Sequence, residues 1–295
     1  MSKLFKKREL KIDFMRQRVF GYILSAVLLV VSVFSLSTRG LNYGIDFEGG
    51  ILIEASADRV IDLEDTRAKL SFLRDLSIQT AGTEGTTILI QAQPEADENP
   101  NKLVEKIKTT LGSGFQYSQV EVVGPTVGDE LKAKSLWASV LALLAISIYI
   151  WFRFEWPFAI GCLVSLAHDL IIVVGAFSLF QWEFDMIVVA GLLSLAGYDC
   201  NDSIVTYDRV RENLKKFRKD TTDSILNRSI NETLSRTLLT SLTTLFVVLV
   251  LLFVGGETLR GFSLTMVLGT IFGTYSSIYV AVPLLRYFDI RTVGE

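Results

Sequence analysis

Apolar residues along this chain fall into long runs that short polar stretches separate. A helix of about 20 residues crosses about 30 Å of hydrocarbon, because each residue adds a rise of about 1.5 Å. Six of the runs reach this length. The pattern therefore predicts transmembrane helices at residues 19–37, 134–152, 157–180, 186–207, 237–254 and 262–285.

The segment 38–133, between the first two runs, has the pattern of a folded aqueous domain. Alternating apolar positions predict strands, and a spacing of three to four residues predicts helices. The predicted elements are a strand at 51–55, a helix at 61–76, strands at 77–80 and 86–93, a helix at 99–111 and a strand at 115–123. This βαββαβ order is typical of an α+β ferredoxin-like domain. The fold class we predict is thus a multi-pass α-helical membrane protein with such a domain between helices one and two.

The distribution of Lys and Arg predicts the orientation, because basic residues accumulate in short cytoplasmic loops. They concentrate near both termini and in the loop after the fourth run, whereas the loop before that run carries Glu183 and Asp185 but no Lys or Arg. The first run follows a basic stretch and has no cleavage site after it, so we expect an uncleaved anchor. We place in the cytoplasm residues 1–18, 208–236 and 286–295, and on the opposite side the domain 38–133.

Composition excludes several classes of function. The net charge is -3 and no basic face dominates, so we expect no nucleic-acid partner. Both cysteines, Cys162 and Cys200, fall inside predicted spans, so we expect no disulfide. No residues have metal-ligand or catalytic-triad spacing, and we predict no metal and no cofactor.

Acidic residues inside the apolar runs are the strongest indication of function. Asp169 follows His168, the only histidine, in the third run. Asp199 and Asp202 lie three apart in the fourth run and so share one helix face. A charged residue at a helix centre costs about 2.5–3.5 kcal/mol to insert, which favours a functional role such as proton binding. The alternative is that these acids only pair with neighbours and hold helices together.

Arg236 begins the fifth run and is the natural counter-charge for Asp202. A plain cytoplasmic anchor explains this arginine equally well.

The segment Gly44–Gly50 (GIDFEGG) follows the first span. Its glycines Gly44, Gly49 and Gly50 and the acid Asp46 predict a tight structural junction that leads into the first strand. Small residues four apart predict close helix packing. They are Gly21 with Ser25, Gly161 with Ser165, and Gly269 with Gly273 and Ser277.

Short motifs throughout the chain, taken together and in order, are specific to one family. They are DFMR at 13–16, GIDFEGG at 44–50, VGPTVG at 123–128, FRFEW at 152–156, AHD at 167–169, GYDCNDS at 197–203, DRVREN at 208–213, SRT at 235–237 and GFSLTM at 261–266. On these residues the chain resembles the SecF members of the SecD/SecF family, membrane subunits of the bacterial Sec protein-export machinery and relatives of the resistance-nodulation-division transporters.

The resemblance implies a location in the bacterial inner membrane, with the domain 38–133 in the periplasm. It implies work with SecD beside the SecYEG channel, often with YajC, on unfolded preproteins, among membrane lipids. The family is thought to use the proton-motive force to promote export. Six helices are half of the twelve-helix arrangement of such transporters, so a homologous partner is expected.

The family's Asn-Asp pair falls on Asn201 and Asp202, and that aspartate is its proposed proton carrier. The family's arginine falls on Arg236. This chain departs from the family at Asp199 and Cys200, where a small or apolar pair is usual. The role of Asp199 is therefore open: it could couple to the titration of Asp202 or reflect an altered sequence. The coupling ion, proton or sodium, is also open.

Two other functions compete with a proton-driven transport subunit, which is not an enzyme. One is a scaffold that only stabilises its partners. The other is an intramembrane aspartyl protease, because Tyr198-Asp199 is similar to the first motif of those enzymes, although the Gly-x-Gly-Asp motif is absent.

Overall fold

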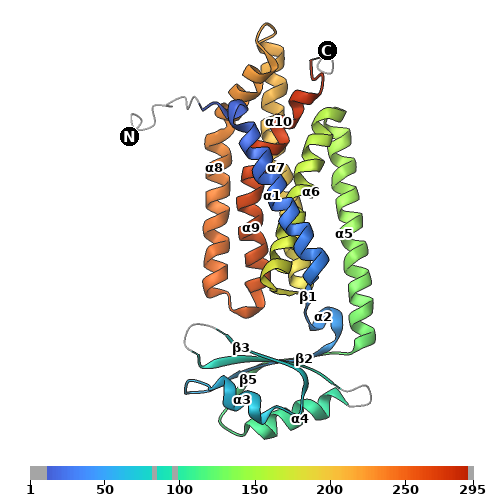
Figure 1. The fold of residues 1–295 in the computed structure, drawn as a ribbon, viewed down its shortest axis with the longest axis vertical. Helices are drawn as coiled ribbons and strands as arrows, with labels where there is room; N and C mark the ends of the chain where they lie inside the picture. The colour runs from blue at the N-terminus through green and yellow to red at the C-terminus, as the bar shows by residue number, and fades with distance from the viewer. Residues whose placement is uncertain (1–11, 82–84, 95–98, 292–295) are drawn as a thin grey trace.

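The computed structural model describes residues 12–81, 85–94 and 99–291. Long helices form a bundle, and a small α/β domain lies at one end of it, opposite the end where the first and last described residues lie (Figure 1). The basic residues predicted for the cytoplasm at 1–11, and the last residues of the chain, lie outside the described ranges.

Six long helices build the bundle: α1 (Phe14–Arg39), α5 (Pro125–Arg153), α6 (Trp156–Phe180), α7 (Met186–Lys216), α8 (Thr222–Val254) and α9 (Arg260–Ser276), as far as the structure is described. A π-helical segment, Ser277–Ala281, interrupts the last one before α10 (Val282–Leu284) and a 3-10 turn, Leu285–Tyr287. Pro283 lies just beyond this segment and lacks the N–H that a regular helix needs there, which favours the wider turn.

Five helical stretches in the described part of the chain are long and apolar enough to cross a membrane: Phe14–Arg39, Thr126–Arg153, Trp156–Phe180, Thr222–Val254 and Glu257–Tyr287. The sequence predicts six spans, and the difference is α7. Asp199, Asn201 and Asp202 lower the hydropathy of that helix. It packs against α8 and α9 inside the bundle, where neighbouring helices cover its polar face.

The α/β domain has the predicted βαββαβ order. Its elements are β2 (Gly50–Ser56), α3 (Leu63–Lys69), β3 (Arg74–Ala81), β4 (Thr87–Gln93), α4 (Pro100–Leu111) and β5 (Gln116–Val123). The sheet is antiparallel, with the strand order β3-β4-β2-β5. Alternate residues such as Ile53 and Ile90 are buried against Leu103 and Ile107 of α4, so the helices cover one face of the sheet.

The helix predicted at 61–76 is wrong in its extent. α3 ends at Lys69, Leu70 is its C-cap, and β3 already begins at Arg74. Leu70 and Leu73 are both buried in the domain core, so a turn and a strand start reproduce the helical spacing of apolar residues. Asn99, by contrast, caps α4 as the sequence predicts, because its side chain accepts a hydrogen bond from the N–H of Asn101.

A small junction that the sequence pattern does not reveal joins the α/β domain to the bundle. β1 (Asn42–Tyr43) pairs in parallel with β6 (Glu183–Phe184), two strands from loops far apart in the sequence. The glycine-rich segment then forms a one-turn helix, α2 (Ile45–Glu48), and leaves it through Gly49 and Gly50. Both glycines have positive φ, 75° and 146°, which other residues rarely adopt.

Candidate functional site

Three carboxylates lie in the interior of the helix bundle, and we call them the core site. They are Asp169 on α6, and Asp199 and Asp202 on α7, with exposed fractions of 0%, 2% and 6%. The two on α7 share one helix face because they are three residues apart, and that face is buried in the bundle. Such burial demands hydrogen-bond partners, since an unpaired charge in a low-dielectric interior is costly.

Hydroxyl groups of α8 surround Asp202. Thr240 Oγ1 donates to Asp202 Oδ1 and Ser241 Oγ donates to Asp202 Oδ2, each at 3.5 Å. Thr274 Oγ1 of α9 donates to Ser241 Oγ at 2.7 Å. Asp202 is thus held by long, neutral hydrogen bonds, which are weaker than bonds from a cation and leave its charge uncompensated.

Asp169 has closer partners. His168 Nδ1 lies 2.8 Å from Asp169 Oδ1, and Ser276 Oγ of α9 donates to Asp169 Oδ2. Ser165 Oγ, one turn earlier on α6, donates to Ser276 Oγ at 3.0 Å. Ser165, one of the small residues predicted to pack closely, therefore forms a hydrogen bond between α6 and α9 beside this carboxylate.

Asp199 lies between Asp169 and α9. Its carboxyl group lies within hydrogen-bonding reach of Asp169. Its Oδ1 atom has no hydrogen-bond partner, and it lies 2.7 Å from the position that a Cβ of Gly273 would take. The absence of a side chain at Gly273 thus makes the space for this carboxylate.

Two predicted site residues stand apart from the core site. Arg236 is exposed and makes no salt bridge with Asp202, although its charge is near enough to interact with that carboxylate. Asn201 is exposed on the outer face of α7. The structure therefore brings together Asp169, His168 and Asp199, and places Asp202 one turn away from Asp199. Arg236, the predicted counter-charge, does not pair with Asp202.

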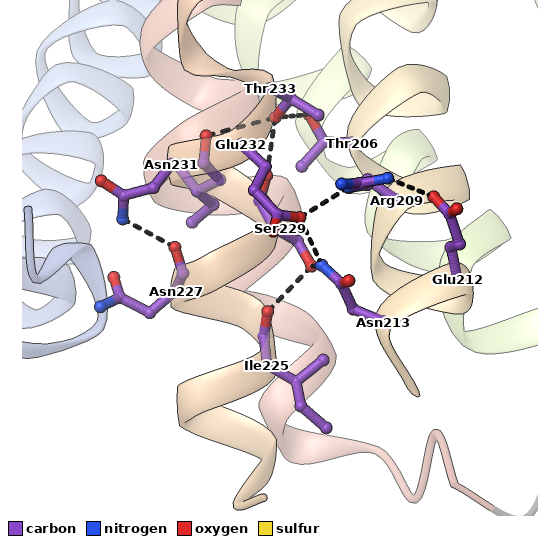
Figure 2. Close-up of polar contacts among 11 residues, drawn as sticks. Thr206, Arg209, Glu212, Asn213, Ile225, Asn227, Ser229, Asn231, Glu232 and Thr233 are labelled. Atoms are coloured by element: carbon purple, nitrogen blue, oxygen red, sulfur yellow. Dashed lines mark hydrogen bonds and ion pairs between the residues drawn. The ribbon is translucent and has the colours of Figure 1, made fainter. Parts of the chain in front are cut away.

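Polar contacts fix the ends of α7 and α8 next to Asp202 (Figure 2). Thr206 Oγ1 donates to the backbone carbonyl of Asp202 at 3.1 Å and lies 3.4 Å from Thr233 Oγ1. Further along, Glu232 accepts hydrogen bonds from Arg209 at 2.6 Å and from Asn213 at 2.8 Å. The bonds hold the two helices together where neither is apolar.

The same part of α8 holds the start of the first span. Asn231 accepts a hydrogen bond from the N–H of Ile12 at 2.9 Å and returns one to its carbonyl at 2.8 Å. Asn227 accepts one from the N–H of Phe14 at 2.8 Å. Residues 222–235 therefore belong to the same uninterrupted helix as the rest of α8, and they contact the start of α1.

A second acidic cluster, the domain junction, comprises Asp46, Glu183, Asp185 and Glu257. Asp185 caps α7 by accepting from the N–H of Val188 at 2.7 Å, and Asp46 accepts from the N–H of Met186 at 3.1 Å. Burial, and then the charges of Asp185 and Asp46, raise the pKa of Glu183 from 4.5 to about 7. Burial also raises the pKa of Asp185.

A crevice of about 190 Å³ separates this junction from the free face of the sheet. Its lining includes Glu54 and Glu121 of the sheet, and Glu183, Asp185, Glu257 and Arg260 of the bundle. Thr258 Oγ1 donates to Gln119 Oε1 across it, at 3.3 Å. The α/β domain is thus docked on the bundle through a polar, mostly acidic interface.

Sequence reasoning missed the hydroxyl groups that face the carboxylates. Thr240, Ser241 and Ser276 lie in helices whose small residues predict only close packing. Four hydroxyl residues among the five at 240–244, in an otherwise apolar part of the helix, are the signal that could have shown them. Within the described ranges, no cluster of three or more His, Cys, Asp or Glu could hold a metal ion.

The chain matches two families of known proteins. Residues 103–291 match the family described as "Protein export membrane protein SecD/SecF, C-terminal". Residues 34–59, which include the glycine-rich segment, match the "SecD/SecF GG Motif".

Individual proteins of known type are similar over nearly the full length. The protein translocase subunit SecF of Haemophilus influenzae is 41% identical over 281 residues, 95% of this chain and 86% of that protein. The SecF of Vibrio alginolyticus is 42% identical over 291 residues, 97% of this chain and 92% of that protein.

Two solved structures have the same fold. The crystal structure of SecDF from Thermus thermophilus, described as a translocon-associated membrane protein, has a TM-score of 0.83 and 36% identity. A SecDF structure in a super-membrane-facing form has a TM-score of 0.70 and 34% identity. This chain is covered to 93% and 96%, but it spans only 38% and 39% of those longer chains.

Proposed function

The chain belongs to the SecD/SecF family as a SecF subunit of the Sec protein translocase, and on that premise we propose that Asp202 couples proton movement to preprotein export. SecF subunits are transport components. We propose that α7 also crosses the membrane, as the fourth of six spans, with both termini in the cytoplasm and the α/β domain in the periplasm of a bacterial inner membrane.

One observation carries the proposal. Asp202 is only 6% exposed, and its hydrogen bonds come from hydroxyl groups rather than from a cation. A carboxylate that no cation neutralises can gain or lose a proton without breaking an ion pair. Arg236 makes no salt bridge with this carboxylate, so no ion pair fixes its charge.

Proton entry can supply useful energy at this site. One elementary charge that crosses the membrane releases about 2.3 kcal/mol per 100 mV. Neutralising Asp202 would loosen its bonds to α8 and allow α7 and α8 to shift. The polar contacts between these helices would pass that shift to the start of α1 (Figure 2). We propose that the docked α/β domain moves in response.

We propose that SecD is the homologous partner, because the two solved SecDF chains are more than twice the length of this one. The exposed side of Asn201 and Arg236 is then available to face it. SecYEG, YajC and an unfolded preprotein complete the proposed assembly.

The test is export of a secretory precursor in cells depleted of their own SecF. The parent chain and its Asp202→Asn variant are supplied at equal membrane abundance. We expect the variant to leave export at the level of depleted cells. The matched control is Asp208→Asn, on the same helix, whose carboxylate pairs with Arg153 at 2.9 Å and is half-exposed. We expect this control to retain export, because exposed ion pairs contribute at most about 1 kcal/mol.

Full export with Asp202→Asn would refute the coupling and leave the scaffold hypothesis. Repeating the assay in sodium-free medium distinguishes the ion, since a sodium-coupled chain would lose stimulation there. One observation favours the protease hypothesis, namely that Asp169 and Asp199 lie close together. Because the chain belongs to a transport family, we look for a different role for this pair.

A further inference from the structure

Asp169 and Asp199 are in contact, and the contact needs a proton. Ionised carboxylates only accept hydrogen bonds, so two carboxyl groups within hydrogen-bonding reach cannot bond unless one of them is an acid. Both are buried, at 0% and 2% exposure, so bulk water does not screen one from the other. Two like charges so close would repel strongly in this interior.

The neighbours show which member holds the proton. Ser276 Oγ donates to Asp169 Oδ2, and His168 Nδ1 lies 2.8 Å from Asp169 Oδ1, where the Nδ1–H tautomer of the imidazole donates as an ionised carboxylate requires. Asp199 has no donor on Oδ1. An orphaned oxygen costs less on a neutral acid than on a carboxylate. Asp199 is therefore the donor to Asp169.

We infer that Asp199 carries a proton that it shares with Asp169, so that the bundle holds a second proton-binding site one turn from Asp202. Proton occupancy itself stands on the geometry above. The use of that proton in transport rests on the proposed function.

The described groups around Asp169 and Asp199 include several titratable side chains but no cation that could replace the shared proton. On α6 the titratable neighbours are His168 and Cys162, and on α7 they are Asp202, Cys200 and Tyr207. From α9, Tyr275 faces Asp169. No Lys or Arg touches either carboxylate in the described ranges, so no fixed cation replaces the proton.

α9 controls the room around Asp199. Gly273 lies against Asp199 Oδ1, and Ser276, one turn further, bonds to Asp169. A small movement of α9 would therefore change both carboxylates at once. The site is built so that proton occupancy and the position of this helix depend on each other.

Infrared spectroscopy tests the inference directly, because a protonated carboxyl group has a C=O stretching band that a carboxylate lacks. The full chain is purified in lipid with its partner subunit, and spectra of the parent and of the Asp199→Asn variant are subtracted at neutral pH. Asn is isosteric, and its amide can still donate to Asp169. We expect the subtraction to show the loss of one carboxylic-acid band.

Asp202→Asn is the matched control, with the same substitution one turn away. We expect the band lost with Asp199→Asn to persist in this control. A band that remains after Asp199→Asn, or that only Asp202→Asn removes, overturns the inference. Loss of the band in the parent on adding sodium, but not potassium, would mean that a cation occupies the site, and would also overturn it. Asp199→Ser serves as a second variant if Asn disturbs the fold. None of these readings depends on export, so they stand apart from the test of the proposed function.

Discussion

The core site and the domain junction both gather carboxylates, and in both a carboxylate oxygen occupies the space that a glycine leaves. Asp199 Oδ1 lies 2.7 Å from where a Cβ of Gly273 would be, and Glu183 Oε1 lies 2.6 Å from the same point on Gly44. The surroundings differ. Asp199 is 2% exposed among helices, whereas Glu183 is half-buried beside the crevice. The core acid can move only with a helix, while the junction acid can move by itself.

The largest effect that this comparison predicts is at Gly273. The methyl group in Gly273→Ala would overlap Asp199 Oδ1. Because Asp199 is buried, its carboxylate cannot move to another rotamer without displacing its neighbours. Overpacking of this kind costs about 1–3 kcal/mol. We expect a lower unfolding midpoint in a denaturant titration, together with reduced export, because Asp199 would also lose its place beside Asp169.

Gly197→Ala is the control for that substitution. Gly197 is also helical, on α7, but a Cβ there meets no atom within 4 Å. Alanine should then stabilise the helix by about 0.5–1 kcal/mol, because it orders the unfolded chain more than glycine does. Equal destabilisation by both substitutions would show that the space beside Asp199 is not special.

The second prediction concerns pH at the domain junction. Burial at the junction, and then the charges of Asp185, Asp46 and Glu121, raise the pKa of Glu183 from 4.5 to about 7. Undocking the sheet would expose this carboxyl and remove the charge of Glu121, so its pKa would fall towards 4.5. Well below pH 4.5 the carboxyl is protonated in the docked and the free state alike, so it costs docking nothing. Between 4.5 and about 7 the docked state binds more protons, so docking weakens as the pH rises and levels off above about 7. Each unit of pKa shift corresponds to about 1.4 kcal/mol before solvent screening.

Glu183→Gln should remove most of this pH dependence, because a neutral amide resembles the protonated acid. Distances between spin labels on α4 and on the turn Glu257–Leu259 would report docking from pH 5 to 8. We expect the parent distribution to broaden as the pH rises, and the variant to stay narrow. If the two respond alike, Asp185 or the other junction acids control docking instead, since the pKa of Asp185 is also raised.

The contrast between the two acidic regions also explains what the sequence could predict. Five of the six predicted spans, the βαββαβ order and the buried positions of Asp169 and Asp202 follow from hydropathy and from periods of two and 3.6 residues, which are local properties. The pairing of β1 with β6 is not local, because two-residue strands separated by some 140 residues leave no periodic signal.

The partners of the acids are equally non-local. A serine such as Ser241 or Ser276 in an apolar helix predicts packing, and only the crossing of α6 to α9 makes it a hydrogen-bond donor. Arg236 shows the opposite error. Its position along the sequence suggests an ion pair with Asp202, but its side chain is exposed and makes no salt bridge with that carboxylate. The depth of a residue along a span can be counted from the sequence, whereas the rotation of the helix, which decides what its side chain contacts, cannot.

The smallest effect should come from Gly44→Ala, which reproduces at the junction the contact tested at Gly273. The added methyl group would meet Oε1 and Cγ of Glu183, a flexible side chain with a crevice beside it, and would lie 3.3 Å from Cβ of Asp185. Gly44 has an ordinary φ of -75°, so alanine adds no backbone strain. Turning one side chain to a less favoured rotamer costs about 0.5–1 kcal/mol.

We expect a small shift of the unfolding midpoint and a lower pKa of Glu183, because the displaced carboxylate is better hydrated. The spin-label transition should then end at a lower pH than in the parent. A loss of stability as large as that of Gly273→Ala would mean that the junction is packed as tightly as the core, and the distinction between the two acidic regions would fail.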